Sequence, residues 1–349
     1  MKTTLNFDLG NYLLNLIAFL LILISIKIIF AKDLLNAVIA ASIFSLLIGV
    51  SYLIMDAPDV AMTEAALGAC LSTCVYLNLL RKLPPYLKNI ERTNIIPASL
   101  ICLLFVVTLA YMGLELPNYG DDNAPIHMYS SKYYLEHTSR DIGVPSFVAA
   151  ILASYRGYDT LGETSVILIA GIAVLLVFSK EDVIPWLDHG IQKKIKKDWM
   201  PWSSHGMTKL KVYPIIKYIT SFIIPYIILY SIYIQLNGES SPGGGFQAGV
   251  IFASSLIAYD LVHGNRKLSR YFPPNMLISI AVLGVAIYAI VGMISLFFND
   301  NYLNYYSLTN FINDKLLAQH IAIVIVEIGI GLTVSGVMYL IYNLFNNHE

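Results

Sequence analysis

The fold of this chain is decided by the stretch MDAPDVAMTEAALGACLSTCVYLNLL, which runs from Met55 to Leu80. It is long and apolar enough to cross a bilayer as a helix, yet it carries Asp56, Asp59 and Glu64 at or inside one end. A carboxylate within the hydrocarbon is costly, so such residues usually line a polar path or pair with a partner. Asp56 and Asp59 fit a helix cap at the water interface equally well. Glu64 lies almost two turns deeper, and its depth favours a role in function.

The composition of the whole chain is that of a membrane protein. Its 349 residues are 57% hydrophobic and only 13% charged, whereas soluble domains carry about 25% charged residues. We predict an all-α, polytopic protein with nine transmembrane helices. The predicted spans are 9–30, 33–54, 58–80, 95–113, 158–179, 213–236, 244–263, 274–298 and 316–344.

The distribution of basic residues predicts the orientation of these spans. With the N-terminus outside, 17 of the 22 Lys and Arg residues fall in segments on the inner side. Cytoplasmic loops are enriched in Lys and Arg, which favours an outside N-terminus and a cytoplasmic C-terminus. Two basic segments contribute most to this asymmetry, 81–92 and 180–212, and the second also holds all three tryptophans as expected interfacial anchors.

Two further spans carry acids. Asp159 and Glu163, at the start of the fifth span, are four residues apart and therefore share a helix face. Two acids on one face at the mouth of a membrane helix favour a cation funnel, and a solvated helix end capped by Glu163 is the alternative. Glu327 lies well inside the last span. A proton relay requires a buried carboxyl that is neutral and can bind a new proton after it releases one, and Glu327 could serve in this way. Alternatively, Glu327 is a neutral carboxyl that forms a hydrogen bond with another helix.

A glycine-rich turn joins the sixth and seventh spans. Gly243, Gly244 and Gly245 follow Pro242 and predict a tight turn, and Gly245 with Gly249 forms a G-x-x-x-G pattern. We expect these glycines to serve helix packing. Exposed N–H groups of the turn could instead bind an anion.

The remaining features exclude several kinds of site. Three cysteines in predicted spans form no disulfide framework, and no Cys or His spacing matches a metal or redox centre. No nucleophile, base and orienting group can be assembled, so we predict that the chain is not an enzyme. An apolar segment at 144–155 is too short to cross the bilayer and predicts a short lateral helix.

Three motifs resemble known membrane subunits. The stretch DAPDVAMTEAALGA, Asp56 to Ala69, resembles the MbhD-type subunit of membrane-bound hydrogenases and the matching C-terminal part of the large subunit of Mrp (Mnh) antiporters. RGYDTLGET, Arg156 to Thr164, is similar to the MbhE-type segment that follows it. SPGGGFQAG, Ser241 to Gly249, is similar to the MnhB signature, and EIGIGLTVSG, Glu327 to Gly336, fits the last helix of that subunit.

This resemblance implies a subunit of a multisubunit Na⁺/H⁺ antiporter in a bacterial or archaeal cell membrane, partnered by larger antiporter-like and small membrane subunits. It divides the chain into an MbhD-like module at 1–92, an MbhE-like module at 93–190 and an MnhB-like module at 191–349. No cofactor is implied beyond Na⁺ and H⁺ as transported ions. The residues expected on the ion path are acids of three spans: Glu64, Asp59, Asp56, Glu163, Asp159 and Glu327.

Two alternatives are also consistent with this sequence. In one, the chain is a scaffold whose acids form interhelical hydrogen bonds. In the other, it is an ion-translocating or scaffold subunit of a hydrogenase-type respiratory complex related to complex I, with electron transfer done elsewhere. Substitution of the acids separates transport from scaffold, and neighbouring genes for redox proteins would favour the second alternative.

Overall fold

The computed structural model describes residues 2–80, 95–117, 120–121, 123–178, 214–263 and 267–347. Within these ranges the regular structure is entirely helical, and nine helical segments are long and apolar enough to cross a membrane. These segments confirm the predicted all-α, multi-pass architecture, and each boundary lies within one residue of the predicted one. The basic segments 81–92 and 180–212 lie outside the described residues, and the orientation of the termini stays a prediction.

The nine spans use eleven helical elements, because the third span is built from three. It consists of α3 (Pro58–Glu64), a π-helical segment η1 (Ala65–Leu71) and α4 (Ser72–Leu80). The other spans are α1 (Lys2–Ile29), α2 (Leu34–Ile54), α5 (Ile95–Gly113), α8 (Gly157–Phe178), α10 (Pro214–Asn237), α11 (Gly245–His263), α13 (Pro274–Phe297) and α14 (Lys315–Asn347).

Shorter helices lie between the spans. The segment after α5 contains η3 (His127–Ser131) and α6 (Lys132–Asp141), which the sequence did not lead us to predict. A helical segment follows as α7 (Phe147–Ala150) and η4 (Ile151–Tyr155); it begins three residues later than expected, because Ser146 Oγ accepts the Ala149 N–H at 3.2 Å as an N-cap. Two more are α12 (Lys267–Tyr271) and η5 (Tyr305–Asn310).

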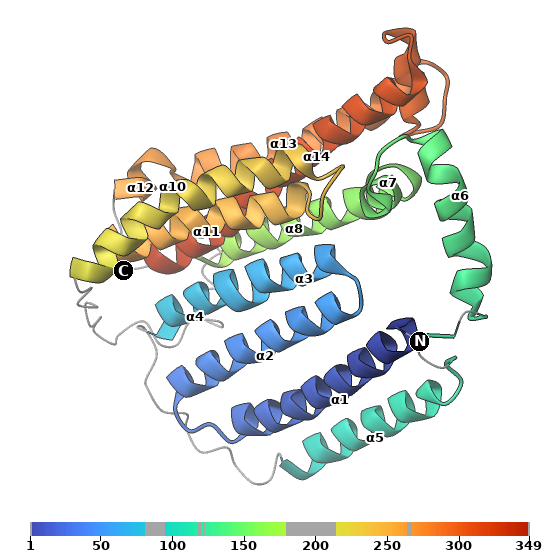
Figure 1. Cartoon of the computed structure of the whole chain (residues 1–349). Coiled ribbons are helices and arrows are strands. Elements are labelled where there is room, and N and C mark those ends of the chain that lie inside the picture. Colours follow the sequence, from blue (N-terminus) through green and yellow to red (C-terminus); the bar gives the residue numbers. More distant parts are fainter. Residues whose placement is uncertain are drawn as a thin grey trace.

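The last helix, α14, is the centre of the fold. It packs against α11, α13 and α8, and more weakly against α4 (Figure 1). Most of its inward side chains are fully buried, including Tyr339, Tyr342 and Leu340. The N-terminal hairpin of α1 and α2 lies farther out, and α3 and η1 connect it to the bundle through contacts with α11.

Close backbone packing holds α14 in place. A Cβ added at Gly249 of α11 would lie 2.8 Å from the carbonyl oxygen of Gly331 on α14. One added at Gly284 of α13 would overlap the carbonyl oxygen of Gly329, on another face of the same helix. Small residues at such crossings let backbones approach closely enough for dispersion contacts, which drive helix association in lipid.

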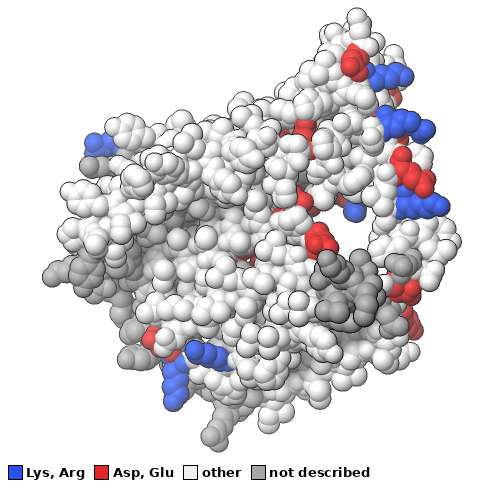
Figure 2. Space-filling view, viewed as in Figure 1, with Lys and Arg blue, Asp and Glu red and all other residues white. Residues whose placement is uncertain are grey.

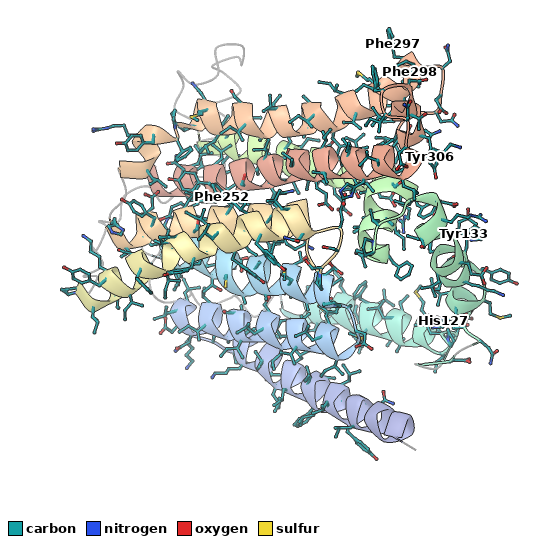
Figure 3. All side chains as sticks on the ribbon, turned by 45° about the horizontal axis from the view of Figure 1, so that its top comes forward. His127, Tyr133, Phe252, Phe297, Phe298 and Tyr306 are labelled. Atoms are coloured by element: carbon teal, nitrogen blue, oxygen red, sulfur yellow. The ribbon has the colours of Figure 1, made fainter. Side chains whose placement is uncertain are left out.

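On one face of the bundle, the exposed charged residues lie toward the two ends of the helices. Figure 2 shows Lys, Arg, Asp and Glu gathered near both ends of the bundle, with a broad, nearly uncharged belt between them on the face in view. Figure 3 shows Tyr133 of α6 and His127 of η3 projecting away from the bundle at one end. The uncharged belt has the character expected of a lipid-facing or partner-facing surface.

Candidate functional site

The turn between α10 and α11 has a backbone that only glycine adopts easily. Gly243 and Gly244 have φ angles of 129° and 156°, in the region that L side chains rarely enter. A Cβ at Gly243 would also lie 2.6 Å from Cγ2 of Ile234. The conformation points the Gly243 N–H out of the turn toward α3.

Asp59 of α3 binds that N–H group. Its Oδ1 accepts the Gly243 N–H at 2.7 Å, and the neighbouring Gln247 Nε2 donates to Thr63 Oγ1 at 2.9 Å. A carboxyl group of the same protein therefore satisfies this N–H group of the turn. These bonds fasten the third span to the start of α11.

Glu327 lies on the opposite side of the turn. It is 6% exposed, and its two carboxyl oxygens approach Gly238 and Gly244. A Cβ on Gly238 would lie 2.9 Å from its Oε2, and one on Gly244 would lie 3.4 Å from its Oε1. The acid is thus enclosed by the turn.

Glu239 is a third acid, and it was missed in the sequence. It lies in the turn, is 5% exposed, and one of its oxygens pairs with His320 of α14. The sequence did contain one signal for it, because Glu239 lies three residues before the Pro-Gly-Gly-Gly run. A turn that packs against a membrane bundle can bury its own side chains. We call Asp59, Glu239 and Glu327 the turn cluster. Within the described chain, no three acid, Cys or His side chains lie close enough together to hold a metal ion.

Glu64 faces a different neighbour, as its five-residue spacing from Asp59 predicts. Its Oε1 accepts a hydrogen bond from Ser45 Oγ of α2. The π-helical segment η1 begins at the next residue, and Ser42 of α2 donates to the carbonyl of Ala69 within it at 3.1 Å. Single π turns inside α-helices occur frequently at functional sites.

The other predicted acids do not join the turn cluster. Asp56 is exposed in the turn between α2 and α3, with a φ angle of 57°. Asp159 is exposed and forms an ion pair with Arg156 one turn earlier. Glu163 is also exposed on α8, so the face it shares with Asp159 points away from the interior of this chain.

Asp260 is a second buried acid that sequence reasoning missed. It is 2% exposed near the other end of α11, where Tyr339 of α14 donates to its Oδ2 at 2.6 Å. It stands in the last turns of a predicted span, and its depth in the bundle comes only from the packing of α14 against α11.

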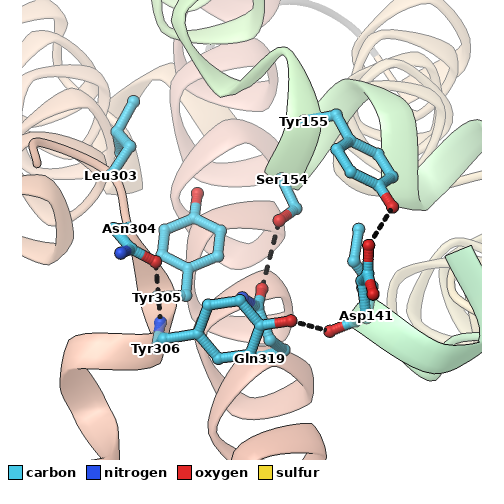
Figure 4. A pocket seen from close by; sticks show the side chains of 9 residues that line it. Asp141, Ser154, Tyr155, Leu303, Asn304, Tyr305, Tyr306 and Gln319 are labelled. Carbon is cyan, nitrogen blue, oxygen red and sulfur yellow. Dashed lines mark hydrogen bonds between the residues drawn. The ribbon is translucent and has the colours of Figure 1, made fainter. Parts of the chain in front are cut away.

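A cavity of about 390 Å³ opens at the same end of the molecule as the turn cluster. Its polar lining includes Asp141, Ser154 and Gln319 (Figure 4). Ser154 donates to Gln319 Oε1 at 3.1 Å, and Tyr155 donates to Asp141 at 3.3 Å. Gln319 directly precedes His320 on α14, so this polar hollow lies close along the helix to the Glu239 pair.

One prediction follows from the Asp59 contact. Asp59→Ala leaves the partly buried Gly243 N–H without its partner; a fully buried unsatisfied donor costs about 1–3 kcal/mol, so we expect the lower end of that range here. We expect a lower thermal unfolding midpoint of the purified full chain. Asp59→Asn keeps an acceptor oxygen, so we expect it to unfold close to the wild type. Equal destabilisation by both substitutions would show that the negative charge, rather than the hydrogen bond, stabilises the contact.

Comparisons with known proteins match the two regions that meet at the turn. The family model described as a domain related to the MnhB subunit of Na⁺/H⁺ antiporter matches residues 215–340, and the MbhD model, which describes a component of MBH, matches residues 19–85. These matches confirm the resemblances inferred from the motifs around Ser241 and Asp56. The domain boundaries at 92 and 190 stay predictions.

Individual relatives cover parts of the chain. An uncharacterised protein of Methanocaldococcus jannaschii is 27% identical over 161 residues, which are 46% of this chain and 60% of that protein. The Na⁺/H⁺ antiporter subunit A1 of Staphylococcus epidermidis is 35% identical over 158 residues, 44% of this chain and 19% of that protein. This chain therefore spans less than two thirds of either relative.

The fold has a solved counterpart. A chain in the structure of the Mrp complex from Dietzia sp. superposes with a TM-score of 0.73 at 20% identity, covering 96% of this chain and 35% of that one. Nearly every helix described above thus has an equivalent in one larger membrane protein. Two segments of this chain resemble two different subunits, joined here in one multi-pass membrane polypeptide.

Proposed function

We propose that this chain is a membrane subunit of a multisubunit Na⁺/H⁺ antiporter, in which its carboxylates contribute to an ion path. Support comes from the two family matches and from the antiporter subunit of S. epidermidis, which shares 35% identity over the aligned part. The role is that of a transporter component, with Na⁺ and H⁺ as the transported ions and no further cofactor.

The observation that carries this proposal is the turn cluster. Asp59 belongs to the segment that resembles the hydrogenase subunit, and Glu327 belongs to the segment that resembles MnhB. Both meet at the same glycine turn, one bound to Gly243 and the other enclosed by Gly238 and Gly244. Burying carboxyl groups among apolar helices costs free energy, and such residues usually belong to a pathway for ions or protons. This position therefore supports a role in transport.

The surface of the chain supports partner subunits. The span within α5 has no buried residue, and Glu163 is an exposed acid within the apolar helix α8. An unpaired carboxylate facing lipid would be strongly unfavourable. A neighbouring subunit that covers Glu163 and packs against the exposed helices would remove that cost.

The hydrogenase-type alternative ranks second. It rests on the match at residues 19–85 alone, whereas the antiporter interpretation draws on the longer match at 215–340 and on the antiporter relatives. The scaffold alternative is distinguished by experiment, because it requires only the hydrogen bonds of the acids and not their charge.

Glu64 provides the first test. The genes of the full complex are expressed with wild type or Glu64→Gln, assembly is checked on a native gel, and Na⁺-induced proton movement is measured in inverted membrane vesicles. We expect an assembled complex with antiport reduced about tenfold or more, since loss of a positioned proton-transfer group has at least this effect on a rate.

Ser45→Ala is the matched control, because it removes the hydrogen bond to Glu64 but keeps the acid. We expect it to retain most of the antiport. If assembled Glu64→Gln complexes show full antiport, the hypothesis that the third span belongs to the ion path is rejected. Equal loss in both variants would support the scaffold interpretation.

A further inference from the structure

Glu239 and His320 form a connection between solvent and the buried turn cluster. Glu239 has a side chain only 7% exposed, whereas the His320 side chain that pairs with its Oε2 is 53% exposed. The other carboxyl oxygen of Glu239, Oε1, is buried and has no hydrogen-bond partner among the described residues. His320 is therefore in contact with solvent, whereas Glu239 is enclosed by the protein.

The turn lies beside two levels of α14, which it contacts through two different residues. His320 and Glu327 are seven residues apart, about two helical turns, so they lie on one face roughly 10 Å apart along the axis. The carboxyl of Glu239 meets the upper level at His320, and the preceding Gly238 contacts Glu327 at the lower level. Any side chain at Gly238 would collide with Gly244 and Glu327, which keeps this approach close.

Few other charged groups face this connection. The segment packed on the turn through the Ser146 N–H, which donates to the Glu239 carbonyl at 2.9 Å, carries no charged residue between 146 and 155. From α14 the titratable groups are His320 and Glu327, and from α3 it is Asp59. The pair is therefore controlled by its own two members and by the acids of the turn cluster.

Burial raises the pKa of Glu239 to about 7. A carboxyl with this pKa can both bind and release a proton near neutral pH, as a group that transfers protons must.

We propose that His320 and Glu239 form a proton-loading relay, which carries protons between solvent and the enclosed side of the turn at this end of the bundle. Solvent protonates His320. The proton on Nδ1 passes to Glu239 Oε2, which leaves His320 neutral and ready to be protonated again. The neutral Glu239 carboxyl then holds the proton on the enclosed side of the turn, and the reverse order releases it. The use of this proton in cation exchange rests on the proposed function, whereas the relay itself does not.

The first part of the test measures protonation directly. The complete complex is purified with wild type, Glu239→Gln or His320→Gln, and the infrared C=O band of protonated carboxyls is followed from acid to alkaline pH. We expect one carboxyl to titrate near pH 7 in the wild type and to be absent in Glu239→Gln. In His320→Gln its midpoint should rise, because a partner that stabilises the carboxylate is gone.

The second part measures proton movement in vesicles. Each single variant should slow proton exchange about tenfold, and the double variant should be no slower than either, because both residues act in one chain of transfers. Ser240→Ala, an exposed neighbour in the same turn, is the control and should keep the wild-type rate. Correct assembly is checked on a native gel for every variant.

The outcomes separate the relay from the antiporter proposal. A neutral-pH carboxyl that persists in Glu239→Gln, or additive losses in the double variant, would overturn the relay while leaving antiport intact. A band that depends on both residues in a complex without Na⁺-dependent exchange would support the relay and reject Na⁺/H⁺ antiport as the function.

Discussion

Glu327→Gln is expected to reduce Na⁺-dependent proton movement roughly a hundredfold, within the range typical for loss of a positioned proton-transfer group. Glutamine has nearly the same shape and keeps an oxygen to face Gly244, but it cannot take up or release a proton. Because Glu327 is 6% exposed and lies where α11, α14 and the turn meet, no solvent molecule readily replaces it. The measurement is proton movement in inverted vesicles from cells that express the complete complex.

Glu136→Gln is the matched control, since Glu136 is an exposed acid on α6 outside the bundle core. It should leave exchange unchanged. Native gels establish that both variants assemble. An assembled Glu327→Gln complex with wild-type exchange would mean that the carboxyl serves only as a hydrogen-bonding group, and the scaffold interpretation would then hold for α14.

The second large effect concerns helix packing. Gly245→Ala is expected to prevent stable assembly, because its Cβ would overlap the backbone carbonyl oxygen of Glu327. Both groups belong to helix backbones, so a side-chain rotation cannot relieve the clash. Overpacking a core typically costs about 1–3 kcal/mol and occasionally more, and we expect the upper end here. The thermal unfolding midpoint of the purified chain and the yield of complex on native gels both measure it.

Gly162→Ala is the control for this prediction. It is also a glycine inside a membrane-spanning helix, α8, but a Cβ there meets nothing within 4 Å in this chain. Alanine is the better helix former by about 1 kcal/mol, so the variant should unfold at the same or a higher temperature. If Gly245→Ala is as stable as Gly162→Ala, the packing of α11 on α14 is looser than the structure shows.

Much of the architecture could be read from the sequence. Runs of about 20 apolar residues reveal a membrane helix because no other segment of that length can satisfy its backbone inside lipid. That argument needs no partner, and it located all nine spans within the described residues. The motifs at Asp56 and Ser241 likewise identified the two subunit types that the family matches confirm.

Other elements depend on partners that a local pattern does not contain. The helix α6 was missed because its residues, KYYLEHTSRD, are too polar to signal a buried helix. The π-helical turn at Ala65–Leu71 was missed because its extra residue per turn is accommodated by α2, through Ser42 and Ser45. Both α2 and α11 pack against this segment, and a local sequence pattern contains neither partner.

The sequence by itself determined that Glu64 and Glu327 stand inside apolar helices, because polarity and depth along a span are properties of a linear pattern. Only the tertiary structure decided which acids meet. It brings Asp59 and Glu327 to the turn cluster, leaves Glu163 on the surface, and buries Glu239 beside His320. The burial of these acids depends on contacts between segments that are up to 268 residues apart in the chain, from Asp59 to Glu327. Those contacts are set by close packing at glycines of different helices, which the sequence of one helix alone does not specify.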